Sequence, residues 1–256
     1  MMNTGPLVSI VTPSFNQVEF IEQTILSVLN QTYSNIEYII IDGGSTDGSL
    51  EIIKKYSSSL KYWTSEKDNG QTDALLKGIK QVKGQIFAYL NSDDLLELNA
   101  VELIINEYSK TPNYTLYYGQ CLVIDQNNKK IVPYQGGITS FKYLLTQKMM
   151  PFVHQPAFFF NIKLINSSFL FNIKYSFCFD YELILWIFKY KKAKFIDLPL
   201  AQYRMHDKAK TSVSKQKMIA EKLGIQWQYG KQYWPLWLWR EMKFRISTIL
   251  ALHHNK

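Results

Sequence analysis

The sequence Leu90-Asn91-Ser92-Asp93-Asp94 directly follows residues 85–89, an apolar run of the kind that forms a buried β-strand. Two adjacent carboxylates at that point place negative charge where open α/β sheets bind ligands, at the carboxyl ends of their strands. Divalent Mg²⁺ and Mn²⁺ bind one or two protein carboxylates and complete their shells with water and substrate phosphates. The motif therefore predicts a metal-diphosphate site. The alternative is that Asp93 caps the next helix and Asp94 is a solvated loop charge.

Strand and helix patterns alternate through the first part of the chain. Strands are predicted at residues 7–12, 36–41, 60–64 and 85–90, and helices at residues 19–31, 49–56, 71–82 and 99–110. Strands that alternate with helices of this length form a largely parallel sheet with both faces covered. The sequence therefore predicts an α/β fold whose first half binds a nucleotide.

The length and composition of the chain indicate how many domains it can form and in which cellular compartment it folds. A chain of 256 residues with 46% hydrophobic content can bury one sizeable core and carry an appendage. The only two cysteines, Cys121 and Cys178, form no CxxC motif, which argues against a disulfide framework and for a reducing compartment. Neither a secretory signal nor an apolar run of roughly 18 residues is found, so no membrane-spanning helix is expected.

Each predicted strand of the first half ends in polar or glycine-containing sequence. After the first strand, Thr12-Pro13-Ser14-Phe15-Asn16 offers hydroxyls, backbone groups and an aromatic edge to a nucleotide. After the second, Asp42 can accept hydrogen bonds from a base or ribose, and Gly43 permits close backbone approach. After the third, Lys67 suits a phosphate and Asp73 a sugar hydroxyl.

These segments also have a structural interpretation. Residues 42–44 have the composition of a turn, and residues 68–73 that of a solvated helix start. Agreement among all four strand ends favours one shared ligand site.

Four motifs together, at residues 11–16, 41–48, 69–74 and 90–94, resemble the family-2 glycosyltransferases of GT-A fold. The resemblance runs through about residue 212, and the motifs occur in the family's order. It implies a Rossmann-like, mixed and mostly parallel sheet flanked by helices. It also implies an inverting transferase that uses a nucleotide-diphosphate sugar, expected to be a UDP-sugar, with Mg²⁺ or Mn²⁺. The implied donor-binding residues are Thr12, Pro13, Ser14, Phe15, Asp42, Gly43, Lys67, Gly70, Gln71, Asp73, Asn91, Ser92 and Asp93.

The resemblance also implies the metal ligands. Asn91-Ser92-Asp93 stands where the family has its Asp-x-Asp motif, with Asp93 as a ligand. The chain departs from that motif at Asn91, which keeps a hydrogen bond to ribose possible but removes one negative charge. Weaker metal affinity is expected unless Asp94 contributes. His206 matches a position that approaches metal or diphosphate in the family, and a structural role is its alternative.

A second informative segment is Phe179-Asp180-Tyr181-Glu182, at the start of a predicted helix. Taken alone, Asp180 is a candidate helix cap. The resemblance implies instead that it is the general base. Inversion requires a base that takes the proton of the acceptor hydroxyl while that oxygen attacks opposite the departing nucleotide. An Asp with an ordinary pKa of about 3.9 is already ionised at neutral pH.

The second half is expected to supply the acceptor site. Residues 114–125 predict a strand that turns through a hairpin into residues 131–133. In the resemblance, His154 and Gln155 border the acceptor pocket, and a His154 that anchors the core is the alternative. Arg204 is expected to contact either phosphate or an internal carboxylate.

The predicted organisation is a GT-A domain over residues 1–212 and a tail over residues 213–256. Within the domain, residues 1–110 form the nucleotide-sugar half and residues 111–212 the acceptor half. The tail holds four of the six tryptophans, and eight Lys and Arg residues against two Glu, so it carries most of the net charge of +8.

An apolar helical face is predicted in the tail, formed by Leu238, Met242, Ile246 and Ile249. Together with its Trp and basic residues, this face suits an anionic membrane surface. The alternative is a helix packed on the catalytic domain or on a second subunit of an oligomer. Nucleic-acid binding is not expected, because the charge is confined to the tail and no recognition module is found.

Two functions from different classes remain. The favoured one is a glycosyltransferase in the cytoplasm, peripheral on the inner face of the cell membrane, with a glycan or polyprenyl-linked acceptor. The other is a non-catalytic nucleotide-binding or nucleotidyltransferase relative. Release of a nucleoside diphosphate distinguishes the first from the second.

Overall fold

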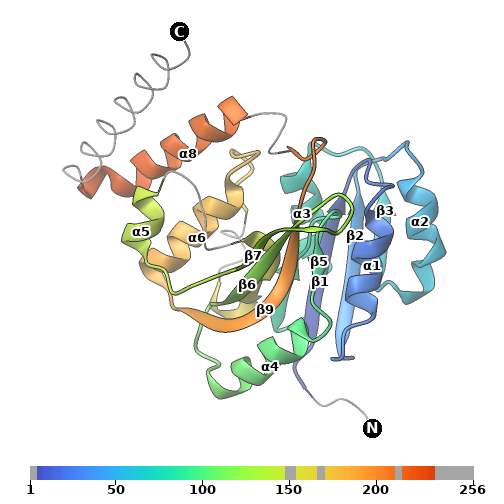
Figure 1. Ribbon diagram of the computed structural model, residues 1–256, viewed down its shortest axis with the longest axis horizontal. Coiled ribbons are helices and arrows are strands. Elements are labelled where there is room, and N and C mark those ends of the chain that lie inside the picture. Colours follow the sequence, from blue (N-terminus) through green and yellow to red (C-terminus); the bar gives the residue numbers. More distant parts are fainter. Residues whose placement is uncertain (1–4, 148–153, 166–170, 211–214, 234–256) are drawn as a thin grey trace.

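The computed structural model describes residues 5–147, 154–165, 171–210 and 215–233, and its centre is one mixed β-sheet (Figure 1). In this part of the chain the sheet order is β3-β2-β1-β4-β8-β6-β9-β5, with β7 paired to β6. The strands are β1 (Val8–Ser14), β2 (Ile36–Asp42), β3 (Tyr62–Ser65), β4 (Ile86–Tyr89), β5 (Leu95–Leu96), β6 (Leu116–Asp125), β7 (Lys130–Gln135), β8 (Phe158–Asn161) and β9 (Ala193–Met205).

Strands β1 to β4 run parallel, so their carboxyl ends lie at one edge of the sheet. Ser14 pairs with Asp42, which in turn pairs with Ser65. Strand β8 is antiparallel to β4 and β6, whereas β9 is parallel to β6. Residues 90–94 therefore leave β4 beside the ends of β1 and β2, as the parallel arrangement predicted.

Helices cover both faces of the sheet. They are α1 (Ile21–Leu29), α2 (Ser49–Lys55), α3 (Gln71–Ile79), α4 (Ala100–Lys110), α5 (Phe141–Thr146), α6 (Phe179–Tyr190) and α8 (Lys215–Gly230). One core lies between the sheet and α1, α2 and α4, and the other lies under α3, α5, α6 and α8. Neighbouring strand residues divide between them, with Ile10 and Ile40 in the first core and Val11 and Ile41 in the second. The strands are apolar on both sides for this reason.

The predicted α/β architecture is confirmed. All eight predicted elements of the first half are present, and β6 and β7 form the predicted hairpin. The short strand β5 and helix α5 were not predicted. Strand β9 was not predicted as one element, because Pro199 lies within it and interrupts the strand pattern.

Helix α8 packs against α5 and α6, although the sequence assigned its residues to a tail. Its residues Ile225 and Tyr229 are buried in the core that contains α6. Residues 215–230 are therefore part of the folded unit. The predicted face from Leu238 to Ile249 lies outside the described residues. Among the helices that the structure describes, none has both the length and the apolar character needed to span a bilayer.

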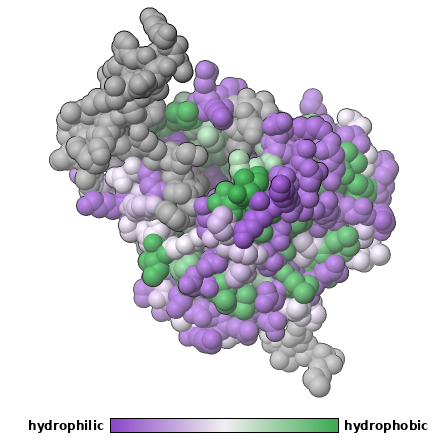
Figure 2. All heavy atoms as spheres, in the orientation of Figure 1, coloured by the Kyte–Doolittle hydropathy of each residue, from purple (hydrophilic) through white to green (hydrophobic). Residues whose placement is uncertain are grey.

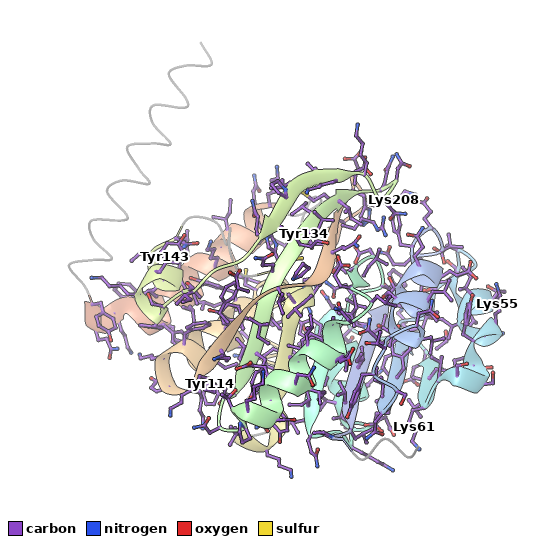
Figure 3. All side chains as sticks on the ribbon, turned by 60° about the horizontal axis from the view of Figure 1, so that its bottom comes forward. Lys55, Lys61, Tyr114, Tyr134, Tyr143 and Lys208 are labelled. Atoms are coloured by element: carbon purple, nitrogen blue, oxygen red, sulfur yellow. The ribbon has the colours of Figure 1, made fainter. Side chains whose placement is uncertain are left out.

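The surface view in Figure 2 is mainly hydrophilic, and its hydrophobic residues form small separate groups. Figure 3 shows Tyr134 on β7, and its hydroxyl donates to Oε1 of Glu97 at 2.8 Å. The Nε2 atom of Gln202 donates to the same oxygen at 3.0 Å. Glu97, just after β5, therefore ties together β7 and β9.

Candidate active site

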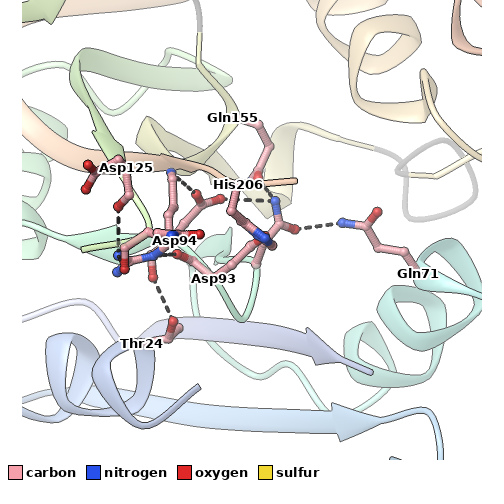
Figure 4. Close-up of polar contacts among 10 residues, drawn as sticks. Thr24, Gln71, Asp93, Asp94, Asp125, Gln155 and His206 are labelled. Atoms are coloured by element: carbon pink, nitrogen blue, oxygen red, sulfur yellow. Dashed lines mark hydrogen bonds and ion pairs between the residues drawn. The ribbon is translucent and has the colours of Figure 1, made fainter. Parts of the chain in front are cut away.

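Asp93 and His206 meet at the carboxyl edge of the sheet (Figure 4). Asp93 lies between β4 and β5, and His206 directly follows β9. The Nε2 atom of His206 is 3.0 Å from Oδ2 of Asp93. The Asp93 side chain is 17% exposed, whereas that of His206 is 2% exposed and packs on the ring of Phe20. The structure thus brings together two of the three residues predicted as metal ligands.

This pair fits a divalent metal. Carboxylate oxygen suits Mg²⁺ and Mn²⁺, and neutral imidazole is a common metal ligand. Among the described residues no three His, Cys, Asp or Glu side chains gather into a candidate metal cluster. Two protein ligands suit an ion that completes its shell with water and a substrate diphosphate.

Asp94 turns into the fold. It is 1% exposed, and its carboxylate accepts the N–H of Arg204 at 2.9 Å and the amide of Asn91 at 3.1 Å. Burial, together with the charge of Asp93, raises its pKa well above the ordinary range. The prediction of Asp94 as a metal ligand is therefore corrected. Its carboxylate oxygens accept hydrogen bonds from Arg204 on β9 and from Asn91 after β4, and so join the two strands. The structure does not support a solvated loop charge either.

Arg204 is buried beneath the same segment. Its Nε donates to the backbone oxygen of Asp93 at 2.7 Å. The other guanidinium N–H groups donate to the backbone oxygens of Asp125 and Gln126 and to the side chains of Asn128 and Gln23. Arg204 is thus engaged inside the fold, but its guanidinium contacts backbone and amide oxygens and not the predicted carboxylate. Within the described part of the chain, only its backbone N–H donates to a carboxylate, that of Asp94.

Asn91 is the centre of an amide network. Its Oδ1 accepts from Nε2 of Gln71 at 2.7 Å, and its Nδ2 donates to Oε1 of Gln155 at 3.0 Å and to Asp94. Nε2 of Gln155 in turn donates to the backbone oxygen of Tyr89 at 2.6 Å. An amide can donate and accept at once, whereas a carboxylate here would face the oxygens of Asp94 and Gln155. This explains why Asn fits at position 91.

Asp42 is buried at the end of β2 and organises the loop that follows. Its carboxylate accepts the N–H groups of Gly44 and Ser45 and the hydroxyls of Ser45 and Ser65, at 2.5–3.1 Å. Gly44 has a φ of +82°, which a glycine adopts without strain. An added Cβ at Gly43 would lie 2.8 Å from Oδ2 of Asp68, so a larger residue there would require the Asp68 side chain to move. These contacts agree with the interpretation of residues 42–44 as a turn. Contact between Asp42 and a nucleoside stays a prediction.

The residues after β1 are divided between core and edge. Thr12 is fully buried, and its hydroxyl lies 2.9 Å from that of Tyr38 inside the core, so its side chain is not available to a donor. Pro13 is also buried. The buried hydroxyl of Ser14 has no partner among the described residues. Phe15 is 59% exposed at the edge, where its ring can meet a base.

The start of α3 carries the remaining donor candidates. Gly70 has a φ of +100° directly before the helix. The Oδ2 atom of Asp73 accepts the N–H of Asn69 at 3.0 Å, so this carboxylate is bound to the loop that leads into the helix. Lys67 is exposed in the loop before α3, and Ser92 is buried in the β4–β5 connection. Only Gln71 of this group is joined to Asn91.

Asp180 lies in the first turn of α6, with Oδ1 accepting the N–H of Tyr181 at 2.7 Å. Burial raises its pKa from 3.8 to about 6, against the opposing effects of that hydrogen bond and of the Lys210 ammonium. The expectation of an ordinary pKa is therefore wrong, because Asp180 is half-buried and its carboxylate is only partly hydrated. A carboxylate with this pKa is ionised at neutral pH and is a stronger base than an exposed Asp.

Comparison with known families assigns the chain. The family model described as Glycosyl transferase family 2 matches residues 9–170. The chain belongs to this glycosyltransferase family. It is 32% identical over 208 residues to an uncharacterized glycosyltransferase of Rickettsia bellii, an alignment that covers 78% of the chain and 30% of that relative. The chain therefore spans less than a third of that protein.

Two solved structures share the fold of this glycosyltransferase. One is Staphylococcus aureus TarS, residues 1–349, in complex with UDP-GlcNAc, with a TM-score of 0.65 and 14% identity over 81% of the chain and 61% of TarS. The other is the mannosyltransferase PcManGT from Pyrobaculum calidifontis in complex with GDP-Man and Mn²⁺. Its TM-score is 0.63, with 14% identity over 89% of the chain and 65% of PcManGT. At these identities the likeness concerns the fold alone.

The two predicted acceptor residues of the glycosyltransferase are turned toward protein partners. Gln155 is buried in the amide network of Asn91. The ring of His154 stacks on that of Tyr203 at 5.7 Å, and its Nε2 lies 3.5 Å from Oε1 of Gln135. Burial lowers the pKa of His154. These contacts favour the core-anchoring alternative for His154.

Lys210 is a candidate site residue of the glycosyltransferase that the sequence did not reveal. Its Nζ donates to Oε1 of Gln71 at 3.1 Å and to the backbone oxygen of Ser176. It also lies over the rings of Phe177 and Phe179, at 5.1 and 5.8 Å from their centroids. Lys210 therefore joins the start of α3 to the loop that leads into α6 and Asp180. A single lysine carries no periodic signal by which the sequence could identify it.

Proposed function

We propose that this glycosyltransferase inverts the anomeric centre of a nucleotide-diphosphate sugar, a UDP-sugar by preference, as it transfers the sugar to an acceptor hydroxyl. The observation that carries the proposal is the hydrogen-bonded series Asn91, Gln71, Lys210 and Ser176. It connects the segment of Asp93 with the loop before Asp180. This series supports the proposal of a base near the edge at which a diphosphate and a metal are expected.

In the proposed reaction, Asp180 accepts the proton of the acceptor hydroxyl. The hydroxyl oxygen forms a bond to the anomeric carbon as the bond from that carbon to the diphosphate oxygen breaks. The leaving nucleoside diphosphate keeps the electron pair of the broken bond, and the configuration of the sugar inverts. The ammonium of Lys210 supplies positive charge close to this exchange.

Asp93 and His206 are the residues that would hold a divalent metal. Mg²⁺ or Mn²⁺ bound there would neutralise charge on the leaving diphosphate. The Mn²⁺ and GDP-Man in PcManGT and the UDP-GlcNAc in TarS support a nucleotide-sugar donor with a metal for this chain. Phe15, Ser14 and the Asp42 loop border the same edge and are proposed to contact the nucleoside.

A donor screen tests this function. UDP-GlcNAc, UDP-glucose, UDP-galactose and GDP-mannose are each incubated with the protein and Mn²⁺, and release of free UDP or GDP is measured. We expect release with at least one donor, and loss of that release in Asp180→Asn with retained donor binding. Release of pyrophosphate, or binding of donor without any release, would favour the nucleotidyltransferase or non-catalytic alternative.

The acceptor and the cellular location are part of the proposal. We propose a glycan or polyprenyl-linked acceptor at the inner face of the cell membrane, supported by the basic, Trp-rich composition of residues 231–256. Sedimentation with vesicles that contain anionic lipid tests the location. Equal sedimentation with neutral and anionic vesicles would contradict it.

A further inference from the structure

The loop before α6, residues 175–178, is held by one side of α8. The hydroxyl of Tyr175 lies 3.2 Å from Oε1 of Gln228, and Sγ of Cys178 lies 3.4 Å from the backbone oxygen of Met218. Met218, Glu221 and Gln228 are spaced three and seven residues apart, which places them on one face of a helix. That face is turned toward the loop.

Glu221 makes the most extensive contact on this face. Its Oε1 accepts the N–H of Ser176 at 2.9 Å, and its Oε2 accepts the N–H groups of Phe177 and Cys178 at 2.8 and 3.0 Å. Three successive backbone N–H groups form a concave site for an anion. Hydrogen bonds to a charged acceptor are about twice as strong as neutral ones.

This contact replaces a missing local cap. Helix α6 begins after Cys178, whose side chain makes no capping hydrogen bond. The carboxylate that organises the entry into α6 therefore comes from α8. Asp180 follows Cys178 by two residues, and the backbone oxygen of Ser176 accepts from Lys210. One carboxylate thus fixes the loop on which both Asp180 and Lys210 depend.

We propose that Glu221 is a positioning residue for glycosyl transfer, which holds loop 176–178 so that Asp180 and Lys210 face the donor edge. The proposal rests on the proposed role of Asp180 as base. It assigns to helix α8 a part in catalysis, in addition to its part in the core.

Electrostatics agrees with this placement. Burial is the main cause of the raised pKa of Asp180, and the negative charge of Glu221 adds to it. Removing that charge is therefore expected to lower the pKa of Asp180. The acid side of the pH–rate profile then moves to lower pH.

Hydrogen exchange provides a test that needs no ligand. In Glu221→Ala, the amides of residues 176–178 lose their acceptor, and we expect their exchange to accelerate about tenfold or more, as loss of a charged hydrogen bond implies. Glu51→Ala, which removes a carboxylate from the exposed side of α2, is the control and leaves these amides unchanged. Unaltered exchange in folded Glu221→Ala would overturn the proposal.

Kinetics provides the second test, with the nucleotide sugar that gives most release in the donor screen and water as acceptor. Because a small displacement of a catalytic group can cost about 100-fold, we expect kcat of Glu221→Ala to fall about 10- to 100-fold. We expect the donor KM to stay within about twofold, because the donor edge is untouched. Glu221→Gln keeps one acceptor oxygen, so we expect its kcat to lie between those of the parent and of Glu221→Ala. The acid limb of its pH–rate profile should lie at lower pH than that of the parent.

The two proposals fail in different ways. If Asp180→Asn turns over like the parent, the base assignment fails. If Asp180→Asn is inactive but both Glu221 variants keep the parent kcat, only the positioning role fails. Equal loss of donor binding and kcat, with an unmoved pH limb, would show a purely structural role and also overturn it. If Glu221→Ala does not fold, Glu221→Gln carries both tests.

Discussion

The Nε2 atom of His206 lies 3.0 Å from Oδ2 of Asp93, although the two residues are 113 positions apart in the chain. Strand β9 makes this approach possible. Its residue Arg204 is bonded through its backbone N–H to Asp94 and through its guanidinium to the oxygen of Asp93. The candidate metal site is therefore assembled by the sheet from two distant segments.

The first prediction concerns His206. We expect His206→Ala to weaken UDP binding in the presence of Mn²⁺ about 10- to 100-fold, a loss typical of a disrupted metal site. Titration calorimetry with and without Mn²⁺ measures it. Binding without the metal should be similar in the variant and the parent. A variant that binds UDP with Mn²⁺ as tightly as the parent would exclude His206 as a ligand.

The second prediction concerns the pH dependence of Asp180. A base with a pKa of about 6 is protonated at lower pH, so kcat should fall tenfold per pH unit below about 6. Activity should be constant between about pH 7 and 8. A profile whose acid limb lies near pH 4 would indicate an exposed carboxylate as the base.

The raised pKa of Asp180 also affects how the free energy of unfolding depends on pH. Because the folded state raises the pKa of Asp180, proton binding stabilises the fold at low pH, and that stabilisation is lost as pH rises through about 6. We therefore expect Asp180→Asn to raise the free energy of unfolding at pH 8 by about 1–2 kcal/mol. Urea unfolding should show a smaller difference near pH 4.

The third prediction concerns Lys210. Lys210→Ala removes a cation that lowers the pKa of Asp180, so the acid limb of the profile should move to higher pH. Loss of the link between Gln71 and Ser176 should also reduce kcat about 10- to 100-fold. Lys210→Arg retains the charge and serves as the control for the shift. An unmoved limb in Lys210→Ala would contradict the assigned contact.

The fourth prediction concerns the departure at position 91. Asn91→Asp restores the Asp-x-Asp motif but places a carboxylate beside Asp94 and the oxygen of Gln155. We expect a loss of about 1–3 kcal/mol in the free energy of unfolding without metal. Added Mn²⁺ should recover more stability in this variant than in the parent. Thermal unfolding at several Mn²⁺ concentrations measures both effects.

The sequence predicts the first half well because its signals are local. Helical periodicity in residues 19–31 and the apolar run of residues 36–41 each determine one element, and parallel strands bring their carboxyl ends together. The placement of Asp93 at this edge follows from that topology, whereas His206 was expected there only from the family resemblance.

The orientation of individual side chains does not follow from local pattern. Asp93 and Asp94 are adjacent and identical, yet one is partly exposed and the other is buried against the N–H of Arg204. Lys210 and Glu221 acquire their roles only through contacts with a loop more than thirty residues earlier in the chain. Such roles depend on tertiary packing, which composition and periodicity do not encode.

The guanidinium of Arg204 also binds the tip of the β6–β7 hairpin. There it donates hydrogen bonds to the backbone oxygens of Asp125 and Gln126 and to the side-chain oxygen of Asn128. The neighbouring Asn127 is exposed. A small environment-sensitive fluorophore attached to a cysteine at position 127 would therefore sit one side chain away from the segment that carries Asp93. We expect its emission to report nucleotide binding in real time, from a position outside the candidate active site.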